Sequence, residues 1–276
     1  MTLAHRLSDQ AEIIAQRHLS TAGIAVQTKI DGSPATAADH EIEQALRSMI
    51  SREHPADAFL GEEFGAHGSS THRWIIDAID GTASFLAGEP EWSTLIALEE
   101  HGSVSMGMVS APALHRRWWA ACGSGAWTST YPAHPAAPPQ RLTITGATKL
   151  HEARIGIWPP PSRLSEADRA MAAELAARAA QTRPALDWGA PQPTCPPPPK
   201  PSTGSGTCHG ALLVATGHLD AFLLLGAGPW DIAALVPIIK EAGGAFSDLS
   251  GTRETNTKAA LFSNISLHGQ ILDTWR

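Results

Sequence analysis

The chain has 276 residues, of which 43% are hydrophobic and 17% are charged, and its 27 acidic and 20 basic side chains give a formal net charge of −7. This length suffices for one large domain or two moderate ones, and the apolar fraction excludes a disordered chain. The sequence contains no run of Lys and Arg, whereas nucleic acids and anionic membranes are bound by clustered cations. A small-molecule partner is therefore favoured.

The sequence also argues against a membrane or secreted protein. No stretch approaches the roughly 18 uninterrupted apolar residues of a transmembrane helix. The N-terminal residues alternate charged and apolar side chains, unlike a secretory signal. Cys122, Cys195 and Cys208 form no CxxC pair, which favours reduced thiols over a disulfide framework or a zinc site. We expect a cytoplasmic protein.

Two helices are predicted at the N-terminal end. Apolar residues recur at three- and four-residue spacing from Leu3, so the first helix should end near Gly23. Thr36 and Asp39 have the spacing of a capping box, which predicts a second helix that ends before Pro55.

The middle of the chain predicts an antiparallel meander, because short apolar runs follow one another closely, separated by Gly, Pro and acidic turns. The runs are Trp74–Ile76, Thr94–Leu98, Val104–Val109, Arg117–Ala121 and Leu142–Thr145.

Two arginines and two tryptophans at residues 116–119 could form a nucleic-acid patch. Strand alternation would place Arg117 and Trp119 on one face and Arg116 and Trp118 on the other, which favours packing within a sheet.

From about residue 150 the pattern alternates between strands and helices, which is typical of an α/β arrangement. The predicted elements are a strand at Ile155–Trp158, a helix at Ser165–Ala180, a helix at Gly210–Thr216, a strand at Leu219–Leu225 and a helix at Trp230–Ala242. We therefore expect an α+β part over residues 1–148 and an α/β part over residues 149–276.

The segment 191–206 is rich in proline and runs into glycine and serine. Its composition predicts an extended surface loop, and a ligand for an SH3-like partner is the alternative.

Four carboxylates stand at places that suggest metal binding. Asp77 ends an apolar strand, and Asp80 follows three residues later, before a glycine that permits a tight turn. Glu62 and Asp231 could join them from elsewhere in the chain. Carboxylate oxygens are the ligands that Mg²⁺ prefers, usually together with water and a substrate phosphate.

Gly81 and Thr82 add a phosphate site to the same turn, because free backbone N–H groups in a glycine-containing turn bind phosphate oxygens. Taken singly, each piece also has an ordinary interpretation. Asp77 and Asp80 could be turn acids, and Glu62 and Glu63 a solvated pair.

Together these pieces resemble the inositol monophosphatase family of Mg²⁺-dependent phosphomonoesterases, in the same order along nearly the whole chain. The matching motifs are Gly61-Glu62-Glu63, Trp74-Ile-Ile-Asp77-Ala-Ile-Asp80-Gly81-Thr82 with Phe85 and Gly88, Trp230-Asp231 with Ala233 and Ala234, Glu241-Ala242-Gly243-Gly244, and an upstream piece with Lys29, Asp31, Pro34, Thr36 and Asp39. Residues 110–121 look most similar to the actinobacterial branch that includes histidinol-phosphate phosphatases.

The resemblance implies a layered αβαβα sandwich of the inositol monophosphatase and fructose-1,6-bisphosphatase type, with the active site between its two parts. It also implies two or three Mg²⁺ ions. The implied roles are metal binding by Glu62, Asp77, the Ile79 carbonyl, Asp80 and Asp231, water orientation by Glu62 and by Thr82 with Asp39, and phosphate binding by the amides of Gly81 and Thr82. For Asp39 a simple helix cap is the alternative. A homodimer is an open option.

The sequence departs from the family pattern in three places. Ala78 replaces a proline between the two metal-binding acids, which should matter little. Leu224 stands near the position of a substrate-binding glutamate, so a substrate pocket formed by Leu224, Asp80 and Asp231 would lack one carboxylate. Pro237 should kink the last predicted helix.

The sequence therefore predicts a Mg²⁺-dependent phosphomonoesterase that hydrolyses a small alcohol phosphate with activated water. Histidinol phosphate is the leading substrate. Inositol 1-phosphate, a nucleoside or sugar phosphate and a secondary-metabolite phosphate are alternatives, and a catalytically silent binding module is an alternative of another class.

Overall fold

The computed structural model describes residues 1–20, 26–28, 34–130, 138–144, 146–188 and 208–275. Lys29, Asp31 and the proline-rich segment 191–206 lie outside these ranges.

The α-helices of the described residues are distributed over both ends of the chain. They are α1 (Thr2–Ser20), α2 (Ala37–Glu53), α3 (Thr82–Ala87), α4 (Glu166–Arg178), α5 (His209–Ala215), α6 (Pro229–Ala233), α7 (Leu235–Glu241) and α8 (Ile265–Leu272). Among these helices, none is both long and apolar enough to cross a lipid bilayer.

The strands form two large sheets and one small hairpin. They are β1 (Val26–Thr28), β2 (Pro34–Thr36), β3 (Ala58–Gly61), β4 (Gly65–His67), β5 (His72–Asp80), β6 (Ser93–Glu100), β7 (Ser103–Ala111), β8 (Arg116–Ala121), β9 (Ala126–Thr130), β10 (Gln140–Arg141), β11 (Arg154–Trp158), β12 (Gln181–Arg183), β13 (Ala221–Leu225), β14 (Gly244–Ser247) and β15 (Ala259–Asn264).

An eight-stranded sheet has the order β10-β9-β8-β7-β6-β5-β3-β4, and only its β3–β5 pair is parallel. A five-stranded sheet has the order β12-β11-β13-β15-β14, in which β11 runs parallel to both of its neighbours. β1 and β2 form the antiparallel hairpin. The predicted meander is therefore confirmed for β5 to β8.

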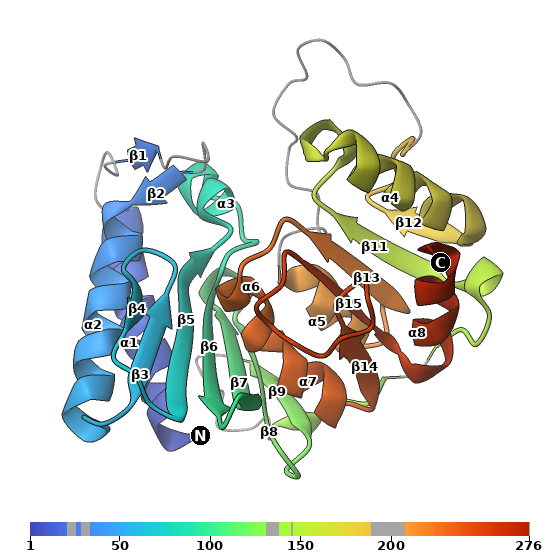
Figure 1. Cartoon of the computed structure of the whole chain (residues 1–276). Coiled ribbons are helices and arrows are strands. Elements are labelled where there is room, and N and C mark those ends of the chain that lie inside the picture. The colour runs from blue at the N-terminus through green and yellow to red at the C-terminus, as the bar shows by residue number, and fades with distance from the viewer. Residues whose placement is uncertain (21–25, 29–33, 131–137, 145, 189–207, 276) are drawn as a thin grey trace.

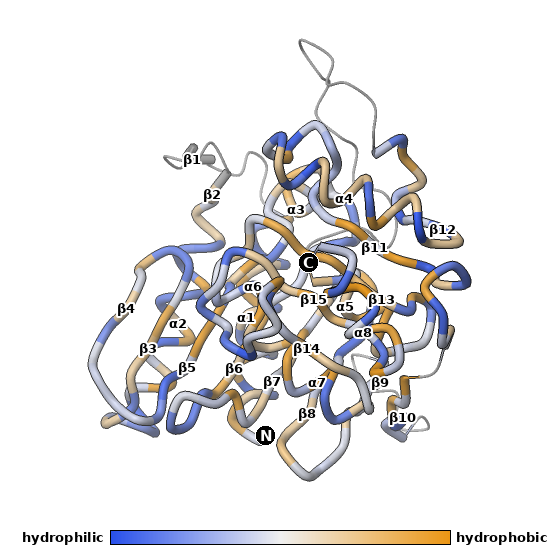
Figure 2. Tube along the Cα trace, turned by 45° about the vertical axis from the view of Figure 1, so that its right-hand side comes forward, coloured by the Kyte–Doolittle hydropathy of each residue, from blue (hydrophilic) through white to orange (hydrophobic). Residues whose placement is uncertain are grey.

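The two sheets alternate with three helical layers (Figure 1). α1 and α2 cover the outer face of the eight-stranded sheet, α5, α6 and α7 lie between the sheets, and α4 and α8 cover the outer face of the five-stranded sheet. Hydrophobic segments gather in the sheets and the central helices, whereas many peripheral turns are hydrophilic (Figure 2). This order is the predicted αβαβα sandwich.

The N-terminal helices form as their sequence predicts. Leu7 and Ile14 of α1 lie on its buried face. At the start of α2, the Thr36 hydroxyl accepts hydrogen bonds from the N–H groups of Ala38 and Asp39, and the Asp39 carboxylate accepts one from the Thr36 N–H. This reciprocal pair is the predicted capping box.

The last predicted helix is wrong as a single element, because the chain forms α6 and α7 with a break at Ala234. Pro237 has no N–H to donate to the carbonyl of Ala233, and its ring would clash there in a continuous helix. The backbone of Ala234 nevertheless stays helical, with a φ of −65° and a ψ of −27°, so the helix is divided by one residue at the place where a kink is predicted.

The strand predicted over Leu142–Thr145 is also wrong for residues 142–144, and Thr145 lies outside the described residues. Leu142 donates its backbone N–H to Ala126 in the eight-stranded sheet, and Ile144 donates its own to Ala242 at the end of α7. These residues cross from one sheet to the next helical layer, so they pair with no single strand. The sequence analysis missed β9, whose residues are mostly polar.

Alternation along β8 is confirmed. Arg117 is buried and donates to Ser110 at 2.9 Å, and it forms ion pairs with Asp9 at 2.7 Å and Glu12 at 3.5 Å, both on α1. Trp118 packs in the core between the sheets, whereas Trp119 packs against the layer of α1 and α2. These residues join the sheet to its neighbouring layers, as predicted.

Candidate active site

A bulge at the end of β5 brings two acids to one side of the sheet. Ile75 faces the core between the sheets, but Ala78 and Ile79 are both packed on the opposite side. The pairing of β5 with β6 shifts register between Asp77 and Asp80, so the alternation of side chains changes phase there. Two residues three positions apart, which a regular strand would separate, can therefore face the same layer.

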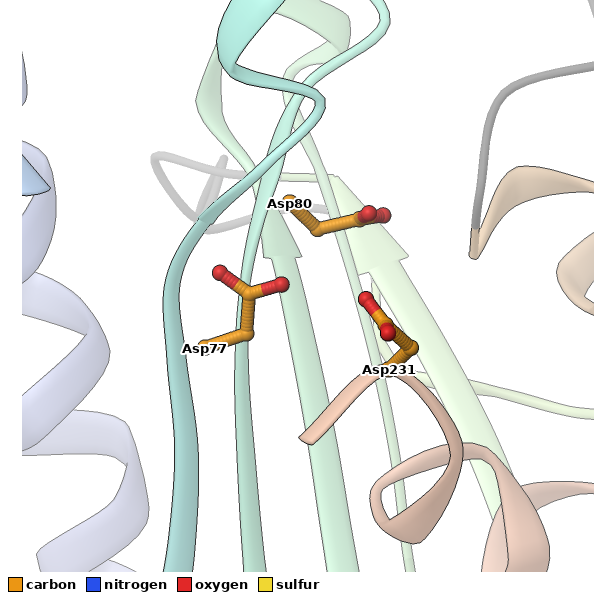
Figure 3. Close-up of side chains that lie close together, drawn as sticks. All are labelled: Asp77, Asp80 and Asp231. Atoms are coloured by element: carbon orange, nitrogen blue, oxygen red, sulfur yellow. The ribbon is translucent and has the colours of Figure 1, made fainter. Parts of the chain in front are cut away.

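Asp231 completes the cluster from the other side. It lies in the first turn of α6, where its Oδ2 accepts a 2.6 Å hydrogen bond from the N–H of Gly228. Asp77, Asp80 and Asp231 each supply one carboxylate oxygen to a group whose three atoms lie within 4.8 Å of one another, and Figure 3 shows the three side chains together. The cluster thus combines the end of β5 with a helix from the central layer.

Asp77 and Asp80, the two acids of β5, are buried, and no described residue of the acidic cluster carries a positive charge. Asp77 is 1% exposed, and its pKa is raised well above its usual range by burial and then by the charges of Glu62, Asp80 and Asp231. Burial also raises the pKa of Asp80 to about 6. Oδ1 of Asp77 is buried and has no hydrogen-bond partner among the residues that the structure describes. Buried acids of this kind are stabilised by a cation, and oxygen donors suit Mg²⁺.

Glu62 lies near the cluster but outside its 4.8 Å limit. It follows the last residue of β3 and is half-buried. Its charge nevertheless raises the pKa values of Asp39, Asp77 and Asp80, which places it within electrostatic range of all three. Three of the four predicted carboxylates therefore lie within 4.8 Å of one another, and the fourth, Glu62, lies near them.

Thr82 connects the cluster to α2. Its hydroxyl lies 3.4 Å from Oδ1 of Asp39 and 3.1 Å from the carbonyl oxygen of Ile79. Asp39 is 1% exposed, and burial raises its pKa to about 6 although hydrogen bonds from Thr36 oppose this. The capping and hydrogen-bonding roles of Asp39 are therefore compatible, since the two carboxylate oxygens have different partners.

Gly81 has the backbone conformation that the turn requires. Its φ of +87° lies in the left-handed region, and it precedes the first residue of α3. A Cβ atom at this position would lie 2.7 Å from the carbonyl oxygen of Glu91. A side chain here would therefore be strained and would collide with the backbone that follows α3.

Leu224 occupies an apolar environment. It is 2% exposed and belongs to the core cluster between the sheets. It supplies no charge to a ligand, in agreement with the departure noted from the sequence.

Two groups that bind Asp80 or the turn beside Glu62 were not among the predicted site residues. The backbone N–H of Cys208 donates to Oδ2 of Asp80 at 2.9 Å. The Glu43 carboxylate accepts hydrogen bonds from the backbone of Glu63 and Phe64, beside Glu62. No sequence pattern marks a backbone donor, but Glu43 was detectable, since it lies one helical turn after Asp39 on the buried face of α2.

The similarity to known proteins includes the residues of both large sheets. The model of the inositol monophosphatase family matches residues 2–274. Histidinol-phosphatases of Mycobacterium tuberculosis and Streptomyces coelicolor are 35% and 34% identical to this chain, over 99% of it and over 96% and 95% of those proteins. The solved structure of a Thermotoga maritima IMPase has a TM-score of 0.76 and 26% identity, with coverage of 98% of this chain and 93% of that one.

Proposed function

This chain belongs to the inositol monophosphatase family and is a phosphoric monoester hydrolase, and we propose that it hydrolyses a small alcohol phosphate with Mg²⁺, histidinol phosphate being the leading substrate. The observation that carries the proposal is the convergence of Asp77, Asp80 and Asp231, in which one buried oxygen of Asp77 finds no hydrogen-bond partner within the described part of the chain.

The donor set fits a hard cation. Asp77, Asp80 and Asp231 would hold Mg²⁺, and Glu62 and the Ile79 carbonyl are the proposed additional ligands. When bound, Mg²⁺ would supply positive charge to the phosphoryl oxygens and lower the pKa of a water molecule. We expect two or three ions in each site.

The remaining residues would orient the reactants. Thr82 is held by Asp39 and by the Ile79 carbonyl, so its hydroxyl has a fixed direction from which to position the attacking water. The backbone N–H groups of Gly81 and Thr82 open α3 and would donate to the phosphate. No covalent enzyme intermediate is needed.

Recognition of an amino alcohol requires a carboxylate that Leu224 does not provide. Glu91 is a second candidate, because its carbonyl oxygen lies against Gly81 and its side chain is 7% exposed. It is the one acid among the described residues that line a pocket of about 350 Å³, which Arg116, Arg183 and His209 also line. We propose that Glu91 contacts the ammonium group of histidinol phosphate.

We also propose that residues 1–148 and 149–276 form two structural parts with the active site between them. A cytoplasmic location and a homodimer stay predictions from the sequence and the family.

The proposal is tested by phosphate release from histidinol phosphate, inositol 1-phosphate, nucleoside 5′-monophosphates and sugar phosphates, with Mg²⁺ and with EDTA. We expect EDTA to abolish phosphate release, and we expect the highest kcat/KM for histidinol phosphate. A preference for another ester would reassign the substrate, and release that persists in EDTA would contradict the metal-dependent site.

A further inference from the structure

Glu43 is a buried carboxylate that binds a turn beside the active site. It lies on α2 and is 0% exposed. Its Oε2 accepts a 2.8 Å hydrogen bond from the N–H of Glu63, and its Oε1 accepts a 2.9 Å hydrogen bond from the N–H of Phe64. Both donors are backbone groups of the chain that leaves β3, so the carboxylate fixes the path of that turn.

The same carboxylate also packs against the residue before Glu62. A Cβ atom at Gly61 would lie 2.0 Å from Oε1 of Glu43, so only glycine leaves room for the side chain in its present position. Glu62 is therefore held on both sides. Gly61 precedes it in contact with Glu43, and the N–H groups of the two following residues are bound to Glu43.

Asp39 and Glu43 lie four residues apart, so they project from the same face of α2. Asp39 accepts a hydrogen bond from Thr82, and Glu43 binds the turn that carries Glu62. α2 is packed against β5, the strand that ends in Asp77 and Asp80. One rigid helix thus supports both the turn after β5 and the turn after β3.

Stability alone is a weak reason for an acid at this place. Glu43 is fully buried, and moving a carboxylate out of water is costly even where two backbone N–H groups bind it. Buried charges can often be replaced by apolar residues without loss of stability. Hydrogen bonds to a charged acceptor are, however, strong and directional, and such contacts are suited to fixing a loop that carries a ligand.

We propose that Glu43 is a positioning residue for Glu62, which it orients toward the metal cluster by fixing the backbone from Gly61 to Phe64. The proposal rests on the proposed function, in which Glu62 is a Mg²⁺ ligand. Glu43 itself contacts neither metal nor substrate.

The test compares Glu43→Gln with Glu62→Gln and with a matched control. Glutamine has the shape of glutamate, but its NH₂ group cannot accept a hydrogen bond, so its single oxygen can keep only one of the two hydrogen bonds. Glu241→Gln is the control, because Glu241 also binds two backbone N–H groups, those of Gly123 at 2.8 Å and Gly125 at 2.7 Å. Mg²⁺ dissociation constants are measured by calorimetric titration without substrate, alongside melting temperatures.

We expect Glu62→Gln and Glu43→Gln to weaken Mg²⁺ binding about tenfold or more, the range seen for groups that orient metal ligands. Glu241→Gln should bind Mg²⁺ like the wild type, even if its melting temperature falls. Gly61→Ala is the second variant, used if Glu43→Gln does not fold, because it displaces the carboxylate by contact and should weaken Mg²⁺ binding in the same way.

Three results separate the proposals. Wild-type affinity in Glu43→Gln, with weakened binding in Glu62→Gln, would overturn the positioning role alone. Equal weakening in Glu43→Gln and Glu241→Gln would overturn it too, because the effect would then be general loosening. Absence of Mg²⁺ binding by the wild type, or unchanged binding in Glu62→Gln, would count against the proposed site itself.

Discussion

The backbone N–H of Cys208 donates a 2.9 Å hydrogen bond to Oδ2 of Asp80, between residues that are 128 positions apart in the chain. Asp80 ends a strand of the eight-stranded sheet, and Cys208 immediately precedes α5 in the layer between the sheets. The bond therefore ties the central helical layer to the acidic cluster. It also counteracts the effect of burial on the pKa of Asp80.

Removing this backbone donor together with the thiol should impair the site more than removing the thiol alone, because both the thiol and the backbone N–H of Cys208 hydrogen-bond to Asp80. Cys208 has a φ of −76°, which proline can adopt. Cys208→Pro deletes the N–H and leaves Asp80 with one hydrogen bond fewer, which costs about 1–3 kcal/mol for a buried acceptor. We expect phosphate release to fall by about tenfold or more. Cys208→Ala keeps the N–H and loses only the thiol, so its rate should fall less than that of Cys208→Pro, and equal losses in both variants would assign the effect to the thiol.

Thr82 offers a test of water orientation. Thr82→Val preserves the shape of the side chain but removes the hydroxyl that lies between Asp39 and the Ile79 carbonyl. We expect kcat to fall by about 10²-fold or more, the scale of positioned catalytic groups, with a smaller change in KM. Thr82→Ser should recover most of the rate. Steady-state kinetics with saturating Mg²⁺ measure both constants, and a purely KM effect in Thr82→Val would contradict the assignment.

The sequence predicted this part of the site because its signals are local. The Thr36 and Asp39 spacing is visible as a capping box, and the acids of β5 fall on a strand end next to a glycine. The long-range contacts were not predictable in the same way. The amide of Cys208 has no side-chain signature, and the turn support by Glu43 depends on how α2 packs against β3.

The wrong assignments also have physical causes. Leu142 and Ile144 are apolar, as strand residues often are, but their N–H groups bond to different elements. Their apolar side chains therefore reflect burial where the chain crosses from the eight-stranded sheet to the next helical layer. The helical spacing of apolar residues continues through Ala234. This spacing alone does not show that Pro237 removes a backbone hydrogen bond there.

Asp39 predicts a pH dependence of the metal-free protein. Its folded pKa of about 6 lies above the ordinary value of 3.8, so the folded state binds more protons between pH 4 and 6. The stabilisation of the folded state by protonation of Asp39 is present below pH 4 and is lost as the pH rises through 6. Asp39→Asn does not titrate. In EDTA, its free energy of unfolding relative to wild type should therefore improve by about 2 kcal/mol from pH 4 to pH 7, since each pKa unit corresponds to about 1.4 kcal/mol.

Urea unfolding at a series of pH values measures this difference. The lost capping box adds a penalty to Asp39→Asn that does not depend on the titration of Asp39, so only the slope with pH is informative. A difference that stays constant from pH 4 to pH 7 would show that Asp39 ionises normally in the folded protein.

Glu91 predicts a change in substrate preference. Glu91→Gln removes the charge proposed to face the substrate ammonium, so KM for histidinol phosphate should rise about tenfold, equivalent to about 1.4 kcal/mol. Inositol 1-phosphate carries no ammonium group, and its KM should change less. Parallel kinetics with the two esters provide the measurement, and equal changes in both KM values would argue against a specific contact.

Asp77→Asn tests the central claim most directly, because the substitution keeps the shape of the residue and removes the most buried charge of the cluster. Phosphate release from histidinol phosphate is measured with Mg²⁺, and the melting temperature is measured in EDTA. We predict that release falls to background while the metal-free protein melts no lower than the wild type, since the cost of burying this acid and its repulsion with Glu62 and Asp80 are relieved. Wild-type turnover by Asp77→Asn would contradict the account of a metal-dependent phosphatase site at this cluster.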